Sequence, residues 1–445
     1  MVANRDKDRS RQFTERLVAL VGTTEAAGLL DALGQKNPRA VRFNRRLCAA
    51  DRLPGPVVPW NAPFGRYWQE EIPPSRSIPY AAGHYYIQEA SAMLAVAAAS
   101  RVIDFSQVIA LDMTAAPGGK ATQAAELIDR GYLVANEVMP ARRPALTWNI
   151  NRHRLDNVVM TSVPGRDLAA ALAGFFDLVL VDAPCSGEGL FQLGKHALKN
   201  WSESQVLACA RRQKGILQEA LSLLKPGGYL VYSTCTFARE ENEDQVEFLL
   251  SRGLAPVPLP ADLPVSAAIS DNDKVLSCAR RIFPHREKGA GAFVAVLQKG
   301  MDKIEARPVA FAYRLTEEKT RAACPAYLRP PGPDTYIYEK NGILNLFPHD
   351  RLPQFLFDKS LQLGAPLLDR RRGDRPMYGG LHLARPERVI DLDGSQADCY
   401  LSGHIPALDL SPGIYFVANQ GLILGPLRVT SSGSDNLLPL PLRQK

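Results

Sequence analysis

The segment VIALDMTAAPGGK, residues 108–120, is the most informative part of this 445-residue chain. Its first six residues are apolar apart from Asp112, as in a buried strand, and a glycine-rich turn and a helical pattern follow them. In doubly wound α/β domains, such a turn after the first strand is the usual binding place of a nucleotide-like cofactor. The segment therefore predicts the first strand, turn and helix of a cofactor-binding domain.

Strand and helix signals alternate on both sides of this segment. Apolar runs predict further strands at residues 132–138, 157–162, 176–182 and 229–235, and a closing β pair within 281–298. Helices are predicted at residues 88–100, 120–130, 142–154, 205–224 and 240–250. Two short helices are expected within 11–33, the second capped by Thr23 or Thr24. This alternation predicts an α/β fold with a parallel sheet covered on both faces.

The composition changes on either side of this core. Residues 1–60 hold eleven basic and six acidic residues, and a segment rich in proline and aromatic residues follows. After Lys299 the alternation stops, and from about Met377 short β-like runs are separated by Gly and Pro. We expect four parts: an N-terminal domain at 1–85, the catalytic core at 86–300, a connecting region at 301–375 and a β-rich module at 376–445.

Composition and charge exclude several classes of protein. Hydrophobic residues make up 46% and charged residues 22%, which is ordinary globular usage and excludes wholesale disorder. The net charge of +7 permits a polyanionic partner without requiring one. Seven widely spaced cysteines without a CxxC pair argue against a disulfide scaffold and a metal site. The charged N-terminus and the lack of a long apolar run predict a soluble, cytoplasmic protein.

The turn TAAPGGK, residues 114–120, lacks the GxxxxGKS pattern of an ATP-binding loop and the GxGxxG pattern of NAD-binding domains. About twenty residues later, Glu137 ends the second strand, where an acidic residue accepts hydrogen bonds from ribose hydroxyls. A glycine-rich turn with this acid suits a nucleoside without phosphates, such as S-adenosylmethionine. An ordinary turn followed by a surface glutamate is the alternative interpretation.

Two cysteines follow strand ends at the same edge of the predicted sheet. The fourth strand runs into DAPCSGEG (182–189) and the fifth into STCTF (233–237), so Asp182, Cys185 and Cys235 should share one crevice. A single cysteine on a strand is usually a packed core residue, but core packing is a poor explanation for two cysteines that both follow strand ends at this edge. A thiol is needed when the target is a carbon that is not nucleophilic, such as carbon 5 of cytosine, because a thiolate that adds to carbon 6 activates it. Asp182 is placed to hydrogen-bond the ring at N3.

Several motifs, in order, resemble the Nop/Sun family of RNA 5-methylcytosine methyltransferases. They are YYIQEASAM (85–93), TAAPGGK, DAPCSGEG, LKNWSE (198–203), KPGGYLVYSTCTF (225–237), EENEDQV (240–246) and RIFPHREKGAGAFVAV (281–296). VRFNRR (41–46) resembles the family's N-terminal RNA-binding portion. The full layout, with a small C-terminal β-rich, PUA-like module, is similar to the bacterial RsmF type of this family, which methylates 16S ribosomal RNA within the small subunit.

The resemblance implies a role for each motif. Cys235 would be the nucleophile that attacks carbon 6, Cys185 would assist the breakdown of the adduct, and Asp182 and Pro184 would shape the base pocket. S-adenosylmethionine would be held by Asp112, Ala115, Ala116, Pro117, Gly118, Gly119, Lys120, Glu137 and Asp182. The implied partner is RNA, and the implied state is a monomer.

Two stretches depart from the family pattern. The family usually has an acid after the third strand that contacts adenine, but Pro164 stands there, so Asp167 is the predicted substitute. After GEG the family usually shows an Arg-Lys pair, whereas this chain has Gln192 and Leu193, with Lys195 displaced. The same chemistry on transfer RNA is one alternative. The departures motivate another, a ribosome-assembly protein that binds RNA with a weakened cofactor site. The retention of both cysteines argues against the second.

One basic cluster lies outside the core. Arg370, Arg371, Arg372 and Arg375 stand close together near the end of the connecting region. We expect them to contact RNA phosphates, with solvated surface charge as the alternative interpretation.

Overall fold

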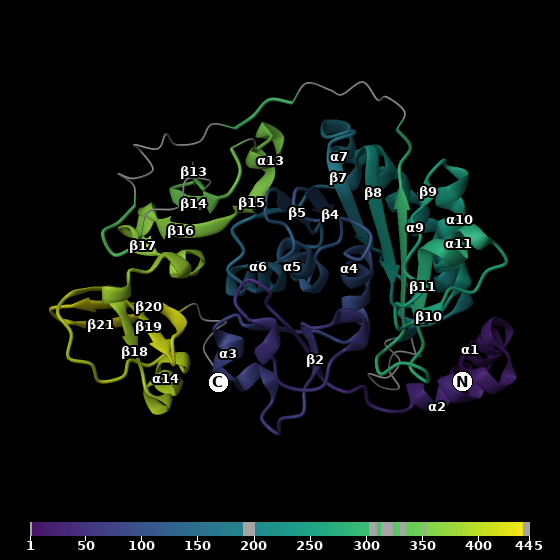
Figure 1. Cartoon of the computed structure of the whole chain (residues 1–445), viewed down its shortest axis with the longest axis horizontal. Coiled ribbons are helices and arrows are strands. Elements are labelled where there is room, and N and C mark those ends of the chain that lie inside the picture. The colour runs from purple at the N-terminus through teal and green to yellow at the C-terminus, as the bar shows by residue number, and fades with distance from the viewer. Residues whose placement is uncertain are drawn as a thin grey trace.

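The computed structural model describes residues 2–189, 201–301, 309–312, 324–329, 335–350 and 352–438. At its centre lies a ten-stranded sheet in the order β10-β11-β12-β8-β7-β4-β5-β6-β15, with β9 beside β12 (Figure 1). The strands from β8 to β6 are parallel, which confirms the predicted Rossmann-like α/β core. The bounds are β4 (Ile109–Asp112), β5 (Tyr132–Asn136), β6 (Val158–Thr161), β7 (Phe176–Asp182), β8 (Leu224–Thr234), β9 (Ala255–Pro256), β10 (Ser266–Ala267), β11 (Ala279–Ile282), β12 (Ala292–Gln298) and β15 (Ser360–Leu363).

The central sheet is apolar on both faces. One face is covered by α4 (Leu94–Ala99), α5 (Gly119–Ala125) and α6 (Arg143–Arg152). The other is covered by α7 (Gly165–Ala171), α9 (Glu203–Leu223), α10 (Glu243–Ser251) and α11 (Asp273–Cys278). Neighbouring residues of one strand belong to different layers, as Ala110 and Leu111 of β4 do. This two-sided burial explains why the strands are continuous apolar runs.

Several elements differ from their predicted lengths. The first helix, α1 (Val2–Val21), begins well before residue 11. The second, α2 (Thr23–Leu33), is preceded by Gly22 at φ +83° with no side-chain cap, so the predicted threonine cap is wrong. The helix expected at 120–130 ends at Ala125. After this residue the chain forms turns, because the backbone nitrogens of Leu127 and Ile128 donate to carbonyls three residues back and not four.

The N-terminal part of the chain contacts the core in two places. The helices α1 and α2 pack on Trp201, Phe237 and Phe283 of the catalytic core. A separate antiparallel sheet, in the order β2-β1-β3, is formed by β1 (Ala40–Phe43), β2 (Gly65–Tyr67) and β3 (Tyr85–Ile87), with the short helix α3 (Ile78–Ala81) before β3. It lies against the α4 and α5 side of the core (Figure 1).

The C-terminal part holds two further sheets, of which the second lies within the predicted β-rich module and the first lies almost wholly in the stretch expected to be a connecting region. One consists of β13 (Tyr336–Lys340), β14 (Ile343–Phe347), β16 (Ala365–Asp369) and β17 (Arg375–Pro376). The other consists of β18 (Val389–Asp391), β19 (Gly413–Asn419), β20 (Leu422–Thr430) and β21 (Gly433–Asn436). The helices of this part are α13 (Gln354–Lys359) and α14 (Gly394–Leu401).

The stretch expected to be only a connecting region adds a strand to the catalytic sheet. β15 pairs with β6 in antiparallel orientation, so the central sheet takes in a segment about two hundred residues further along the chain. The domain boundaries at 85, 300 and 375 stay predictions. Short 3-10 helices lie at Ala50–Arg52, Pro59–Asn61, Pro74–Arg76, Ser91–Met93, Pro140–Arg142, Arg239–Glu241, Arg370–Arg372, Tyr378–Leu383 and Pro386–Arg388.

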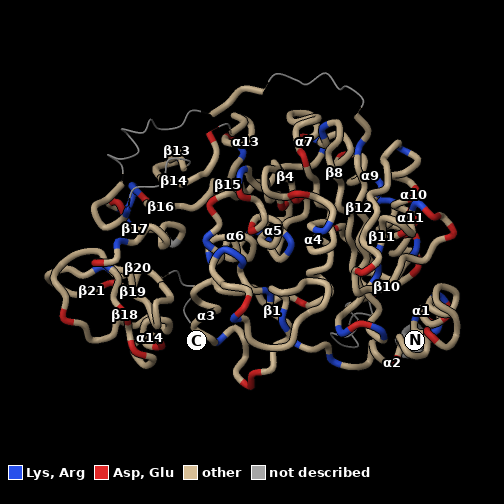
Figure 2. The backbone as a smooth tube through the Cα atoms, in the orientation of Figure 1, with Lys and Arg blue, Asp and Glu red and all other residues tan. Residues whose placement is uncertain are grey.

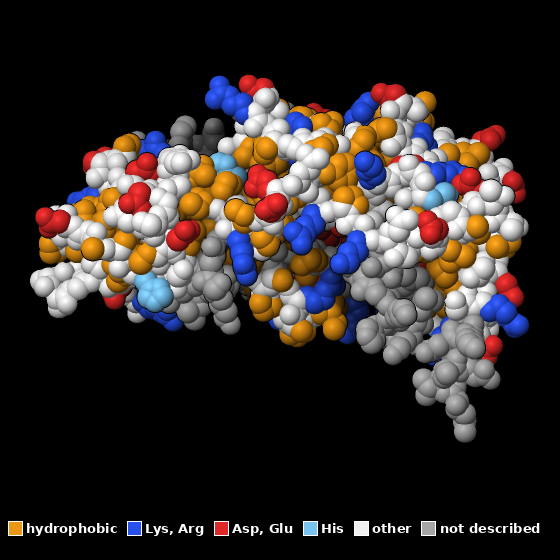
Figure 3. All heavy atoms as spheres, turned by 90° about the horizontal axis from the view of Figure 1, so that it is seen from below, with side chains coloured by type: hydrophobic (Ala, Val, Ile, Leu, Met, Phe, Trp, Pro, Cys, Tyr) orange, Lys and Arg blue, Asp and Glu red, His pale blue; other side chains and the backbone are white. Residues whose placement is uncertain are grey.

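Charge is spread unevenly over the surface. Figure 3 looks at the molecule from below, and Lys and Arg side chains gather in the middle of that face. Such a surface attracts phosphate groups. Within the part of the chain that the structure describes, no helix combines the length and apolar character needed to cross a membrane.

Candidate active site

The two cysteines singled out by the sequence meet at one edge of the central sheet. β7 and β8 run parallel with Asp182 opposite Ser233, so the segments that follow them emerge side by side. The Sγ atoms of Cys185 and Cys235 lie 3.2 Å apart, within hydrogen-bond distance for sulfur. The structure therefore brings both thiols together where the parallel strands end, as the sequence predicts.

An ion pair joins the glycine-rich turn to these strands. The Nζ atom of Lys120 lies 2.9 Å from Oδ2 of Asp182, and the Ser233 hydroxyl donates to Oδ1 of the same carboxylate at 2.9 Å. Burial works against the charge on Lys120, but the attraction of Asp182 outweighs it and raises the pKa of the ammonium above its usual value. The Cys235 sulfur contributes in the same direction, so the Lys120 ammonium lies close enough to this thiol for their charges to interact.

Lys120, Asp182 and Cys235 line a cavity of about 100 Å³, which also borders on Glu89 and Gly291. Glu89 accepts hydrogen bonds from the backbone nitrogens of Ala290, at 2.8 Å, and Ala92, at 3.2 Å. It thereby ties the segment before α4 to the loop before β12. Glu89 belongs to the motif YYIQEASAM, but its local sequence gives no sign of this role.

The two thiols have different surroundings. The hydrogen bond with Cys235 and then burial raise the pKa of Cys185 well above that of an ordinary thiol. Cys185 therefore keeps its proton at neutral pH and can share it with Cys235. This arrangement suits a proton donor at Cys185 better than an attacking thiolate.

Two buried glutamates support the cysteine loops. Glu241 accepts hydrogen bonds from the backbone nitrogen of Ser186, at 3.0 Å, and from Gln213, at 2.8 Å. Burial raises its pKa to about 7. Glu188 accepts from Thr236 and from the backbone nitrogen of Phe237, both at 2.9 Å, and thereby links the loop of Cys185 to that of Cys235.

Glu241 and Glu188 lie within the motifs EENEDQV and DAPCSGEG, but they were not predicted as site residues from the sequence. The loop of Cys185 is also held by Gln213, whose side chain donates a hydrogen bond to the Pro184 carbonyl at 3.1 Å.

The residues predicted to hold the cofactor surround the first strand. Asp112 ends β4 and is buried, and its carboxylate accepts a hydrogen bond from the Thr114 nitrogen at 3.1 Å. Burial raises the pKa of Asp112 to about 7. Gly118 has φ +116°, a conformation that side chains rarely adopt, and it begins α5. Ala115, Ala116 and Gly118 of this turn are buried, whereas Pro117 is exposed.

Glu137 lies at the end of β5 and is 2% exposed. Its Oε1 accepts a hydrogen bond from the Met139 nitrogen at 2.8 Å, and Arg142 lies 3.2 Å from Oε2 as an ion pair. None of the described residues hydrogen-bonds Oε2, so this atom can still accept a hydrogen bond from a hydroxyl group. Two buried carboxylates beside a glycine-rich backbone fit the ribose end of a nucleoside cofactor.

Arg142 and Asn149 fix the turn itself and were not singled out from the sequence. Arg142 donates to the carbonyl of Ala116, and Asn149 donates to the carbonyl of Pro117 at 2.9 Å. Both residues lie within the predicted helix 142–154, but no pattern marks them as contacts of a turn some thirty residues earlier.

Other predicted site residues stand apart or are not described. Asp167 lies in the first turn of α7, where its side chain is 54% exposed and pairs with Arg166 at 3.4 Å. Its contact with adenine stays a prediction. Gln192, Leu193 and Lys195 lie outside the described residues, as do the first three residues of LKNWSE.

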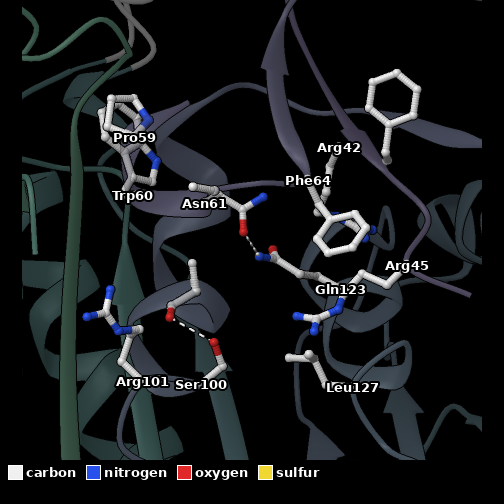
Figure 4. A pocket seen from close by; sticks show the side chains of 13 residues that line it. Arg42, Arg45, Pro59, Trp60, Asn61, Phe64, Ser100, Arg101, Gln123 and Leu127 are labelled. Carbon is white, nitrogen blue, oxygen red and sulfur yellow. Dashed lines mark hydrogen bonds between the residues drawn. The ribbon is translucent and has the colours of Figure 1, made fainter. Parts of the chain in front are cut away.

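The motif VRFNRR holds the N-terminal sheet against the core. Arg42 is 1% exposed, and its guanidinium binds Glu126 at 2.6 Å, Thr122 at 2.7 Å and Gln88 at 2.9 Å. The Arg42 guanidinium is therefore buried in these contacts and is not accessible to RNA. The motif borders a cavity of about 100 Å³, drawn in Figure 4, at whose rim the exposed Arg45 lies over the Phe64 ring at 4.9 Å.

Comparisons with known proteins agree with this geometry. A family model described as 16S rRNA methyltransferase RsmB/F matches residues 105–298. Ribosomal RNA small subunit methyltransferase F of Klebsiella pneumoniae is 32% identical over 404 residues, which cover 86% of this chain and 84% of that protein. The protein of the same name from Salmonella paratyphi A is 41% identical over 243 residues, 54% of this chain and 50% of that protein.

Solved structures show the same fold. A methyltransferase homolog protein from Pyrococcus horikoshii is 27% identical with a TM-score of 0.57, over 65% of this chain and 94% of that one. NSun6 from the same organism, solved with SFG, is 21% identical with a TM-score of 0.55, over 65% of this chain and 98% of that one.

Proposed function

Because this chain belongs to the family of ribosomal RNA small subunit methyltransferase F, we propose that it forms 5-methylcytosine in 16S ribosomal RNA through a covalent bond between Cys235 and carbon 6. The methyl donor is S-adenosylmethionine, which supplies a methyl group on its sulfonium when bound. Asp112, Glu137 and the turn from Ala115 to Lys120 are the residues that fit it. The buried Oε2 of Glu137, which none of the described residues hydrogen-bonds, supports this assignment.

The contact between Cys185 and Cys235 at 3.2 Å carries the proposal. Methylation of an exocyclic amine or a hydroxyl needs no thiol, whereas carbon 5 of cytosine needs one to become nucleophilic. A protonated Cys185 stabilises a neighbouring thiolate by donating a hydrogen bond to it. The ammonium of Lys120 favours the same thiolate by its charge.

The steps follow from these positions. The Cys235 sulfur donates an electron pair to carbon 6, and the electrons of the C5–C6 double bond move towards N3. The ion pair of Lys120 and Asp182 supplies the proton that N3 takes up. Carbon 5 then holds the nucleophilic electron pair and accepts the methyl group.

Release reverses the addition. The Cys185 thiol gives its proton to the departing Cys235 sulfur, and the resulting Cys185 thiolate takes the proton from carbon 5. The electron pair of that C–H bond restores the C5–C6 double bond as the C–S bond breaks. N3 returns its proton to the ion pair, which completes the exchange of hydrogen for methyl at carbon 5.

Nucleoside analysis tests the substrate and the position together. The full chain is incubated with S-adenosylmethionine and either small ribosomal subunits, purified 16S RNA or transfer RNA, and the digested RNA is examined by mass spectrometry. We expect 5-methylcytosine in 16S RNA. Methyl groups on another atom, or 5-methylcytosine in transfer RNA alone, would contradict the proposal.

A further inference from the structure

A cavity of about 480 Å³ lies between α6 of the catalytic core and the strands β16 and β17. We propose that it binds a single-stranded nucleotide that flanks the target cytosine, an inference that rests on the proposed RNA substrate. Its size lies within the range of about 300–1,000 Å³ that small-molecule sites occupy, so one nucleotide fits. The cavity of about 100 Å³ that Lys120, Asp182 and Cys235 line is much smaller.

The lining combines the two kinds of group that bind single-stranded nucleic acid. Trp148 of α6 is half-buried and offers an indole face, and Arg372 and Arg375 offer two guanidinium groups. Bases of any identity stack on aromatic rings, and arginines contact the phosphates between them. Apolar residues complete the walls, among them Pro144 and Met377. A groove for a protein segment would not need the pair of cations beside the indole.

The arginines of the basic cluster differ in the ion pairs that they make. Arg370 pairs with Glu339 at 3.0 Å, and Arg371 holds Asp369 through two bonds of 2.9 Å. The guanidinium of Arg372 lies 3.8 Å from the Asp369 carboxylate, farther than in the other two ion pairs, and the Arg372 side chain is 68% exposed. Asp369 also lines the cavity, but Arg371 compensates its charge. Arg372 and Arg375 are therefore the members that remain for phosphate, along the basic segment between β16 and β17 (Figure 2).

The helix α6 connects this cavity to the cofactor turn. Its residue Asn149 donates to the Pro117 carbonyl at 2.9 Å, whereas Trp148 and Asn151 of the same helix line the cavity. Arg142, directly before the helix, contacts Glu137 at 3.2 Å. The cavity and the cofactor turn are therefore joined by one helix, which favours a nucleotide near the target base over a remote part of the RNA.

Binding of a short fluorescein-labelled single-stranded RNA with a central cytosine tests the proposal. Fluorescence anisotropy is recorded with the full chain over a range of KCl concentrations. The double variant R372Q/R375Q should bind roughly tenfold or more weakly, and its salt slope should fall by roughly 0.7 for each phosphate that the variant no longer neutralises. The control R370Q/R428Q removes the same charge at arginines that pair with Glu339 and Asp435 outside the cavity, and it should keep the wild-type slope.

Substitutions of Trp148 test the stacking. Trp148→Leu keeps the apolar bulk that the fold needs but loses the aromatic face, and it should weaken binding roughly 5- to 150-fold. Trp148→Phe should restore most of the affinity, and a duplex probe should be indifferent to both. Unchanged S-adenosylmethionine binding by calorimetry shows that each variant is folded. Equal salt slopes in the two double variants, or equal affinity of Trp148→Leu and wild type, would overturn the proposal.

The experiments distinguish a failure of the proposed function from a failure of the proposed nucleotide site. A wild-type chain that binds the probe through Trp148 but forms no 5-methylcytosine refutes the proposed chemistry alone. Normal methylation with RNA binding insensitive to Trp148, Arg372 and Arg375 refutes the cavity alone.

Discussion

The Sγ atoms of Cys185 and Cys235 lie 3.2 Å apart, although fifty positions separate the two residues in the sequence. The contact is asymmetric, because the pKa of Cys185 is raised by its hydrogen bond with Cys235 and by burial, while Lys120 turns its charge towards Cys235. In the mechanism that we propose, Cys185 therefore carries the proton and Cys235 makes the attack.

Lys120→Met should slow methyl transfer. The substitution removes the cation that favours the Cys235 thiolate and that supplies the proton to N3, so we expect the single-turnover rate to fall by roughly 100-fold or more. The exposed Lys274 provides the control, since Lys274→Met should leave the rate unchanged. A Lys120→Met enzyme with a normal rate would remove this residue from the mechanism.

Glu137→Ala should weaken S-adenosylmethionine binding. The loss of a hydrogen bond to a charged group costs about 1–3 kcal/mol, which isothermal calorimetry resolves. The variant should remain folded, because Arg142 is half-exposed and keeps its hydrogen bond to the Ala116 carbonyl when the carboxylate is removed. Unchanged affinity would place the ribose elsewhere.

Asp167→Ala tests the predicted adenine contact in the same calorimeter. A loss of affinity of about 1 kcal/mol would support Asp167 as the substitute for the acid that Pro164 replaces. Normal binding would agree with the exposed position of this side chain and assign the adenine to another residue.

Glu241→Gln should change how stability depends on pH. The pKa of Glu241 is raised from its usual 4.5 to about 7 by burial, so between these values the folded chain holds a proton that the unfolded chain releases. Stability should therefore fall as pH rises through this window, by roughly 3 kcal/mol from this group, and level off above pH 7. The glutamine variant should have a flatter curve of unfolding free energy over the same window. Parallel curves for the variant and the wild type would show that Glu241 does not titrate there.

Arg42→Met should destabilise the chain strongly. It leaves the buried carboxylate of Glu126 without its main partner, which costs about 3–5 kcal/mol. Arg101→Met breaks an exposed pair with Asp262 and should cost less than about 1 kcal/mol. Equal shifts of the two variants in urea unfolding would mean that Arg42 does not anchor the N-terminal sheet.

The strand ends were predictable because buried parallel strands are continuous apolar runs, and the residues after them meet at one edge. This is why Asp112, Glu137, Cys185 and Cys235 could be placed in one crevice from the sequence. Local patterns carry no such information for residues that act across loops. Glu241 supports the Cys185 loop and Arg142 supports the cofactor turn, and each contact joins segments far apart in the chain.

Two parts of the fold were unpredictable for the same reason. The short strand β15 joins β6 from about two hundred residues away, and four residues are too few to show a period. Arg42 looked like an RNA contact because it belongs to a basic motif, and only its buried pair with Glu126 shows that it is structural.

Trapping the covalent adduct tests the assignment of the thiols most directly. Cys185→Ala and Cys235→Ala are incubated with S-adenosylmethionine and 16S RNA and analysed on denaturing gels, with Cys399→Ala as the control that should methylate normally. We predict that Cys185→Ala adds to the base, cannot release it and gives a protein–RNA band, whereas Cys235→Ala is inactive and gives none. A persistent band from Cys235→Ala, with none from Cys185→Ala, would contradict the account.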